Sequence, residues 1–325
     1  LEEILRQFLS LGLRLGFVPK VLFETLLRLA NRRGGFILSL LGLELYARSR
    51  QQFASTARSQ TPLVRLRIGL AGKTCCYLAC ITPLLFGFVI PVGVLLKFVL
   101  ASSLAAQIGG IASTVFNSVV ISAVAALLVM LVSAVIVLAA TYRAGRHTRA
   151  MALVASTGYA FPGTMLAIGM LIFAGLIDRT VAAVTNDNVT GLLLGGFGVL
   201  VCAYLVRFQA VGYGATLSGV RRLPDNMMGA SRVLGHDFGS SLRQVILPLL
   251  RSSLVAGALL VFVDVMKELP MTLLLRPFDF ETLATFAYQF AKDEMLEEAA
   301  LPSLMIVIVG LVPVLLMNRM LRQSR

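Results

Sequence analysis

Long apolar runs alternate with short polar segments along most of this 325-residue chain. A helix needs roughly 17–25 mostly apolar residues to cross a bilayer, and six runs reach or approach that length. The fourth run is short, and the last extends back toward Ala299. The pattern predicts an all-α polytopic membrane helix bundle of about six transmembrane helices. The predicted spans are Thr74–Leu96, Val119–Ala140, Met151–Ile177, Gly191–Val206, Ile246–Met266 and Met305–Met317.

Composition supports a membrane protein and argues against a nucleic-acid-binding protein. Hydrophobic residues make up 58% of the chain and charged residues 14%, whereas globular proteins have about 45–50% and about 25%. The net charge of +13 would suggest nucleic acid as the partner of a soluble domain. Here the basic residues lie between apolar runs, so the positive-inside rule explains them better. The expected environment is a lipid bilayer, with no nucleic acid partner.

The charge of the connecting segments alternates with each predicted crossing. Residues 46–73 contain six basic and no acidic residues, and residues 101–118 contain no charged residue. Residues 210–245 contain four arginines and two aspartates, whereas residues 268–301 contain seven acidic and two basic residues. Because basic loops stay in the cytoplasm, both termini are predicted to be cytoplasmic. Residues 268–301 are predicted to lie on the outer face.

The first 60 residues are poorly assignable and are set apart as an N-terminal segment and linker. Their helical pattern contains too many charged residues for a span. The stretch FILSLLGLELY is apolar for only eleven residues, which is too short to cross the membrane alone. They are either the remnant of a span or interfacial helices. The predicted domains are residues 1–60 and a six-span domain, residues 61–325.

Two features of the predicted spans bear on their geometry. Asn117 and Ser118 precede the second span and suit an N-cap. Pro162-Gly163 lies inside the third span and is predicted to kink or locally open that helix. Such a break marks either a pathway or a packing adjustment, and the sequence favours neither.

The stretch GASRVLGHDFGSSLRQVILPLL, residues 229–250, is polar and lies between two apolar runs. It reads as two short helices, the first ending at Gly235 in the left-handed conformation. Asp237 is placed to cap the second helix, and Leu247-Pro248 is predicted to let the chain turn into a new helix. The expected result is a stiff knuckle at the membrane surface, and the alternative is a long solvated loop. We call residues 224–248 the knuckle loop.

The spacing within the knuckle loop resembles the coupling motif of permease subunits of ATP-binding-cassette (ABC) importers. That motif is Glu-Ala-Ala, three residues, Gly, nine residues, Ile, one residue, Leu-Pro. The Gly-to-Leu-Pro spacing is intact here, whereas glycine replaces the glutamate and serine the second alanine. The predicted ATPase-coupling residues are Gly229, Ala230, Ser231, Arg232, Gly235, Val245, Leu247 and Pro248.

Two further stretches resemble the ferric-iron type of these permeases. They are residues 262–310, beginning VDVMKELPMTLLLRPFDFETLATF, and GYAFPGTMLAIG, residues 158–169. The resemblance covers about residues 70–310, the second half of the usual two-half chain. Residues 1–60 do not supply a first half, so a truncated or divergent member is expected.

The resemblance implies a transporter subunit of the bacterial inner membrane rather than an enzyme, without a cofactor. No Walker-type glycine loop is present in the sequence, so ATP hydrolysis is expected on a separate ATPase dimer. The other implied partners are a periplasmic substrate-binding protein at the acidic outer loop and a second permease half or a homodimer partner. The surface expected to meet the ATPase includes Met227, Met228, Ala230 and Leu234, with Arg221 and Arg232 for acidic groups.

Asp264, Lys267 and Glu268 lie at the predicted outer end of the fifth span. Ionisable residues in membrane segments are functional candidates, and carboxylates are hard donors suited to hard cations such as ferric iron. The alternative is an ion pair with Lys267 or snorkelling at the interface. With Pro162 and Gly163, these three residues form the predicted pathway set, without a firm metal site.

Other classes of protein fit the sequence less well. Within the importer class, a permease for thiamine, phosphonate or polyamine would share the knuckle loop and stays an alternative. A secondary transporter would show further broken helices near the midplane, and a channel would show a filter-like segment or charge ring. For an enzyme, His147 and His236 lack suitable neighbours other than Asp237. The four cysteines, Cys75, Cys76, Cys80 and Cys202, are interpreted as small packing residues rather than a metal site.

Overall fold

The computed structural model describes residues 69–101, 104–142, 145–185, 195–224 and 226–323. Residues 1–60, predicted to be a separate segment, lie outside the described residues, and the predicted boundary near residue 60 stays a prediction. The compact unit Leu70–Arg325 contains every described element. Each described element is a helix, which confirms the all-α prediction.

The helices are α3 (Leu70–Leu84), η1 (Leu85–Val89), α4 (Ile90–Ala101), α5 (Leu104–Tyr142), α6 (Arg146–Thr157), η2 (Gly158–Ala160), α7 (Gly163–Thr185), α8 (Phe197–Val220), α9 (Met227–Val233), α10 (Phe238–Ser241), η3 (Leu242–Ile246), α11 (Leu247–Met266), α12 (Pro270–Leu275), α13 (Leu283–Lys292) and α14 (Leu296–Gln323). The segments η1 and η3 are π-helical, and η2 is a 3₁₀ turn.

Within the described residues, six helical segments are long and apolar enough to cross a membrane, as the sequence predicts. The fourth and fifth are longer than predicted, and the last begins near Ala299 as expected. Their bounds are Gly72–Ala101, Ile111–Tyr142, Gly163–Val184, Phe197–Val220, Phe238–Met266 and Leu296–Arg319.

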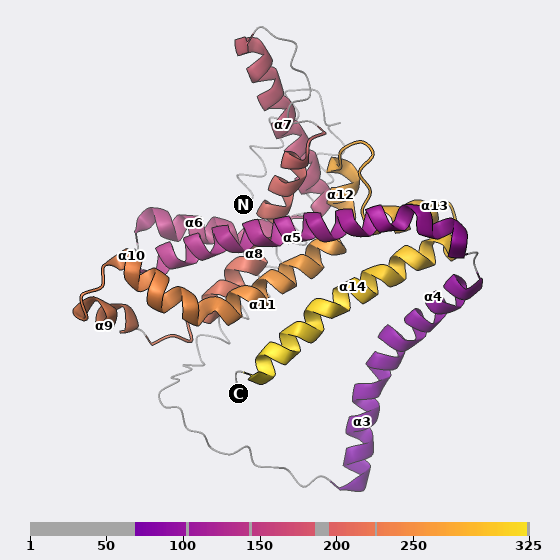
Figure 1. The fold of residues 1–325 in the computed structure, drawn as a ribbon, viewed down its shortest axis with the longest axis horizontal. Helices are drawn as coiled ribbons and strands as arrows, with labels where there is room; N and C mark the ends of the chain where they lie inside the picture. The colour runs from indigo at the N-terminus through magenta and orange to yellow at the C-terminus, as the bar shows by residue number, and fades with distance from the viewer. Residues whose placement is uncertain (1–68, 102–103, 143–144, 186–194, 225, 324–325) are drawn as a thin grey trace, which may run out of the picture. The chain divides into compact units, whose positions relative to one another are not determined.

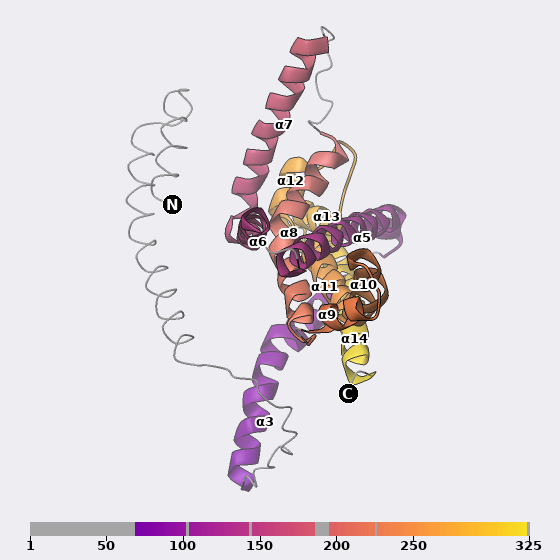
Figure 2. The same cartoon turned by 90° about the vertical axis from the view of Figure 1, so that its left-hand side faces the viewer.

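Helices α5, α8 and α11 pack against one another and form the centre of the bundle (Figures 1 and 2). Small residues allow the close approach. A Cβ on Gly257 of α11 would lie only 2.8 Å from both the Ala215 Cβ and the Met130 Cε. Tyr204 and Phe208 of α8 are almost fully buried in this core. The short helices of the knuckle loop lie at the opposite end of the bundle from α13 (Figure 1).

The third predicted span is not one helix, which corrects the prediction of a continuous Met151–Ile177 segment. Helix α6 ends in the turn η2, Phe161 is extended (φ −85°, ψ 134°), and α7 starts at Gly163. The cause is Pro162, because a proline pushes the residue before it out of the helical region. The predicted opening at Pro162-Gly163 is therefore confirmed, and α7 leaves in a different direction from α6 (Figures 1 and 2).

Asn117 and Ser118 do not cap the second span, because α5 already begins at Leu104. They anchor the start of α13 instead. The Ser118 hydroxyl accepts the backbone N–H of Leu283 at 2.7 Å, at the start of α13. The Asn117 amide donates to the Glu281 carbonyl at 3.2 Å. The two polar residues therefore satisfy groups at the N-terminus of a different helix.

Candidate functional site

Helix α9 of the knuckle loop ends as the sequence predicts, at Gly235. Gly235 has φ +91°, in the left-handed region. Its N–H donates to the Arg232 carbonyl at 3.0 Å, and the His236 N–H donates to the Ser231 carbonyl at 3.2 Å. These two bonds are the Schellman pattern, in which a residue of positive φ closes a helix end. The turn therefore fixes the direction in which the chain leaves α9.

Asp237 caps α10, which confirms the second local prediction. Its carboxylate accepts the N–H groups of Gly239 at 3.2 Å and Ser240 at 3.1 Å. The Ser240 hydroxyl, then these backbone N–H groups, hold the pKa of Asp237 below its usual value. The charged form that best accepts these bonds is thus favoured.

A buried hydroxyl pair joins the two arms of the knuckle loop. The Ser231 hydroxyl of α9 donates to the Ser241 hydroxyl of α10 at 2.8 Å, and both side chains are buried. Ser231 stands where the coupling motif has its second alanine, and its side chain faces α10 rather than solvent. The knuckle loop is therefore a braced structure, not the solvated loop of the alternative.

The exposed surface of α9 differs in part from the prediction. Met227 and Met228 pack against the cluster around Ile246 and are half-buried. The exposed apolar tip consists of Val233, 89% exposed, and Leu234, 79% exposed. Of the other predicted coupling residues, Gly229, Ala230, Arg232, Gly235 and Pro248 are exposed, whereas Val245 and Leu247 are half-buried.

Leu247-Pro248 does not produce a turn, which corrects the third local prediction. The chain stays helical from Phe238 to Met266, a segment of 29 residues. Pro248 lacks an N–H, and its ring would clash with a carbonyl four residues earlier in a regular helix. The π-helical segment η3 directly before it widens the helix, and the Leu247 N–H bonds five residues back to Leu242. The fifth span is therefore joined rigidly to α10.

A second polar site lies at the far end of α11. Arg207 of α8 and Glu268, two residues beyond α11, form an ion pair of 3.5 Å between Nη2 and Oε2. Their side chains are 18% and 8% exposed. The sequence predicted Glu268 as a pathway candidate but missed Arg207, because the predicted fourth span ended at Val206. An arginine inside a helix that continues to Val220 was the available signal.

The Arg207–Glu268 pair lies at the break between α6 and α7. A Cβ on the buried Gly163 would collide with the Arg207 guanidinium and lie 2.8 Å from the Glu268 Oε1. The guanidinium carbon also lies 5.9 Å from the ring centre of Tyr159 in η2. The structure therefore brings together two predicted candidates, Gly163 and Glu268, around an arginine. A larger side chain at 163 would displace the Arg207 and Glu268 side-chain ends from their present positions.

Thr272 ties the start of α12 to the same corner. Its hydroxyl donates to the Glu268 carbonyl at 2.6 Å. The Tyr204 hydroxyl lies 2.5 Å from the Thr272 hydroxyl and is the donor, since the Thr272 proton is already used. Glu268 is thus held through its backbone as well as its carboxylate.

The remaining pathway candidates take no part in the Arg207–Glu268 ion pair. Asp264 pairs with Lys267 at 2.8 Å, and Lys267 is 60% exposed. The predicted alternative of an ion pair with Lys267 therefore holds for Asp264. Glu268 pairs with Arg207 instead. Pro162 is exposed, next to Gly163. Among the described residues, no group of three or more His, Cys, Asp or Glu side chains is placed to hold a metal ion.

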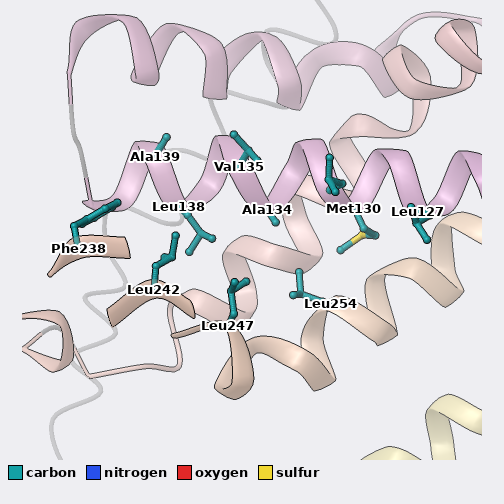
Figure 3. A pocket seen from close by; sticks show the side chains of 11 residues that line it. Leu127, Met130, Ala134, Val135, Leu138, Ala139, Phe238, Leu242, Leu247 and Leu254 are labelled. Atoms are coloured by element: carbon teal, nitrogen blue, oxygen red, sulfur yellow. The ribbon is translucent and has the colours of Figure 1, made fainter. Parts of the chain in front are cut away.

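An apolar groove of about 590 Å³ runs beside the knuckle loop, between α5 and the α10–α11 segment (Figure 3). Its lining includes Leu138, Phe238, Leu242 and Leu254, and each lining residue is apolar. A polar or charged solute needs hydrogen-bonding groups that this groove lacks. The groove is therefore a packing surface for apolar groups rather than a substrate site.

The four cysteines are exposed, so they do not pack in the interior of this unit as interpreted.

Residues 135–324, more than half of the chain, match the protein family described as binding-protein-dependent transport system inner membrane component. The chain belongs to this family. The match includes the knuckle loop, the Arg207–Glu268 pair and the four spans from α7 to α14. Family membership and the six apolar helices make the chain a multi-pass inner-membrane component.

The chain is similar to the Fe(3+)-transport system permease protein FbpB 2 of Haemophilus influenzae. It is 26% identical over 203 residues, which is 62% of this chain and 38% of the relative. The chain thus spans well under half the length of that relative.

Solved structures show a similar fold. The bacterial alginate ABC transporter, in complex with an alginate-bound periplasmic protein, has a chain of 12% identity and TM-score 0.63, covering 78% of this chain and 94% of that one. The MetNI methionine ABC transporter has a chain of 15% identity and TM-score 0.51, covering 65% and 94%. At these identities the likeness concerns the fold alone.

Proposed function

We propose that this chain is the permease subunit of an ATP-driven importer, and that it couples to a separate ATPase through the knuckle loop. The observation that carries the proposal is the braced turn at Gly235. It leaves Val233 and Leu234 exposed to solvent. It is also continuous, through η3, with the fifth span. When a partner displaces a rigid protrusion that is joined to a span, the span is displaced with it. This geometry supports the motif resemblance despite the glycine at 229.

The proposed substrate is ferric iron, delivered by a periplasmic binding protein to residues 268–301. The support for iron is the relative named as an Fe(3+)-transport permease, at 26% identity, together with the resemblance of residues 262–310. Both termini are proposed to be cytoplasmic, in agreement with the alternating loop charge. A second permease half or a homodimer partner completes the proposed assembly.

Reconstitution of the complex tests this function. The chain, in its full genomic reading frame, is co-expressed with the ATPase and binding-protein genes that flank it and placed in liposomes containing ATP. Iron-loaded binding protein added outside is expected to stimulate ATP hydrolysis and iron uptake, because closure of the ATPase shifts a two-state pathway. Thiamine, phosphonate and polyamine uptake serve as competing readouts. Uptake driven by a proton gradient without ATP would contradict the importer proposal.

The outer acidic turn gives a prediction about the binding protein. Asp293 and Glu294 lie exposed between α13 and α14, and Glu294 has φ +60°, which fixes the turn. The double variant Asp293→Lys/Glu294→Lys is expected to weaken uptake by about tenfold at limiting binding protein, because charge complementarity governs encounter. Lys292→Gln, at the neighbouring exposed position, is the control. Unchanged uptake in the double variant would remove this turn from the docking surface.

Glu297 and Glu298 are less suitable for that test. They lie in the first turn of α14, where acidic side chains stabilise a helix by about 0.3–1 kcal/mol each. Replacing them with lysine would therefore weaken the helix as well as the surface charge, and the two effects would be confounded.

A further inference from the structure

We propose that Arg207 and Glu268 act as a latch, a pair of positioning residues that holds the far end of α11 and must rearrange during each transport cycle. The inference rests on the proposed function, because the pair is proposed to respond to the movement that the ATPase causes in the knuckle loop. Arg207 is not among the candidate residues that the sequence predicts.

The first argument is mechanical. The helical segment from Phe238 to Met266 contains 29 residues, a length of about 43 Å at 1.5 Å per residue. One end carries the Asp237 cap and the knuckle loop, and Glu268 follows the other end. A displacement of the knuckle loop is therefore transmitted along a continuous helix to the Glu268 carboxylate.

The second argument is the connectivity of the pair. Arg207 belongs to α8, Glu268 to the corner between α11 and α12, and Gly163, which lies against both side chains, starts α7. Because Pro162 interrupts the chain between α6 and α7, α7 is free of the helical hydrogen bonding that would fix it to α6. Movement of Glu268 thus changes what the start of α7 packs against.

The third argument is that the pair is incompletely satisfied. The ion pair joins Nη2 of Arg207 to Oε2 of Glu268, and the buried Nε and Nη1 atoms have no hydrogen-bond partner among the described residues. Arginine and carboxylate prefer a bidentate arrangement with two parallel bonds. Buried unpaired donors carry a free-energy penalty. An arrangement that pairs these donors would lower that penalty, and it would supply the second state that a two-state element requires.

The neighbouring Asp264–Lys267 pair supplies a matched comparison. It lies at the same end of α11 and also joins an acid to a base, but Lys267 is 60% exposed and the two residues are one helical turn apart. A pair within one helix does not connect α11 to another element. Exposed pairs also contribute little to stability. Breaking the Asp264–Lys267 pair therefore disrupts an ion pair of the same kind and leaves the Arg207–Glu268 pair intact.

The test uses the reconstituted complex and measures ATP hydrolysed per iron atom taken up, together with the binding-protein concentration for half-maximal stimulation. The variants are Arg207→Gln, Glu268→Gln, Arg207→Lys, the charge swap Arg207→Glu/Glu268→Arg, and the control Asp264→Asn. Each glutamine variant is expected to raise the ATP hydrolysed per iron atom by about tenfold, which is within the usual range of coupling free energies. The binding-protein concentration that gives half-maximal stimulation is expected to stay unchanged. Arg207→Lys and the charge swap are expected to recover at least half of the coupling.

Different outcomes separate the latch from the proposed function. A wild-type complex whose ATP hydrolysis ignores the loaded binding protein would overturn the proposed function itself. A coupled wild type with glutamine variants that behave like Asp264→Asn would overturn the latch alone. Loss of uptake in Arg207→Gln beside full coupling in the isosteric Glu268→Gln would also overturn it, because the guanidinium would then serve the substrate rather than Glu268.

Discussion

A Gly235→Val variant is expected to lose coupling to the ATPase while the six apolar helices of the described residues stay in place. Gly235 has φ +91°, and no atom lies within 4 Å of the position that its Cβ would take. The penalty is therefore conformational, about 1 kcal/mol or more for a side chain in the left-handed region and larger for a β-branched one. The strain acts on the two hydrogen bonds that end α9. Stimulated ATP hydrolysis is expected to fall by about tenfold.

Two further glycine variants make this result specific. Gly229 is exposed in the helical part of α9, with nothing within 4 Å of a Cβ, so Gly229→Ala should keep coupling and stabilise the helix by about 0.5–1 kcal/mol. Gly235→Asn should retain most of the coupling, because asparagine tolerates the left-handed conformation. Co-purification with the ATPase and stimulated hydrolysis are measured for all three. Wild-type values for Gly235→Val would remove the strongest support for the importer proposal.

Local chemistry explains why the knuckle loop could be predicted in part from the sequence. The Gly235 helix end and the Asp237 cap each depend on one residue and its immediate neighbours, and such motifs are readable from spacing. The Leu247-Pro248 turn was wrong for a physical reason. A proline ends a helix only if the helix cannot adapt, and here the π-helical segment η3 adapts. The same solution recurs at Pro91, where η1 ends two residues earlier.

Tertiary pairing limited the prediction of the spans and of the polar site. The predicted fourth span ends at Val206, directly before Arg207, and an arginine is costly in a membrane segment. The folded chain offsets this cost with Glu268, which is 61 positions later along the chain, a partner that no local window contains. Ser118 was likewise assigned to the nearest helix start, although it serves Leu283. Apolar runs thus predicted how many spans the described residues contain, and long-range polar contacts decided where some of them begin and end.

The largest structural effect is expected from the smallest substitution, Gly158→Ala. Gly158 is buried in η2, and a Cβ there would collide with the Val206 carbonyl oxygen of α8 and lie 3.1 Å from its carbon. Backbone atoms inside a helix cannot move aside as a flexible side chain can, so α6 and α8 would have to separate. Overpacking costs about 1–3 kcal/mol, occasionally more, and this contact belongs at the upper end. The yield of folded protein in detergent and its melting temperature measure the effect.

Gly169→Ala is the matched control for Gly158→Ala. Gly169 lies in α7, and nothing is within 4 Å of its Cβ position, so this variant should melt at or slightly above the wild-type temperature. Gly257→Ala should fall between the two, because its closest contacts include the flexible end of Met130. Equal melting of the Gly158 and Gly169 variants would show that α6 does not cross α8 so closely. If the ordering holds, the position of α6 fixes the backbone of Val206, and with it the place from which Arg207 reaches Glu268.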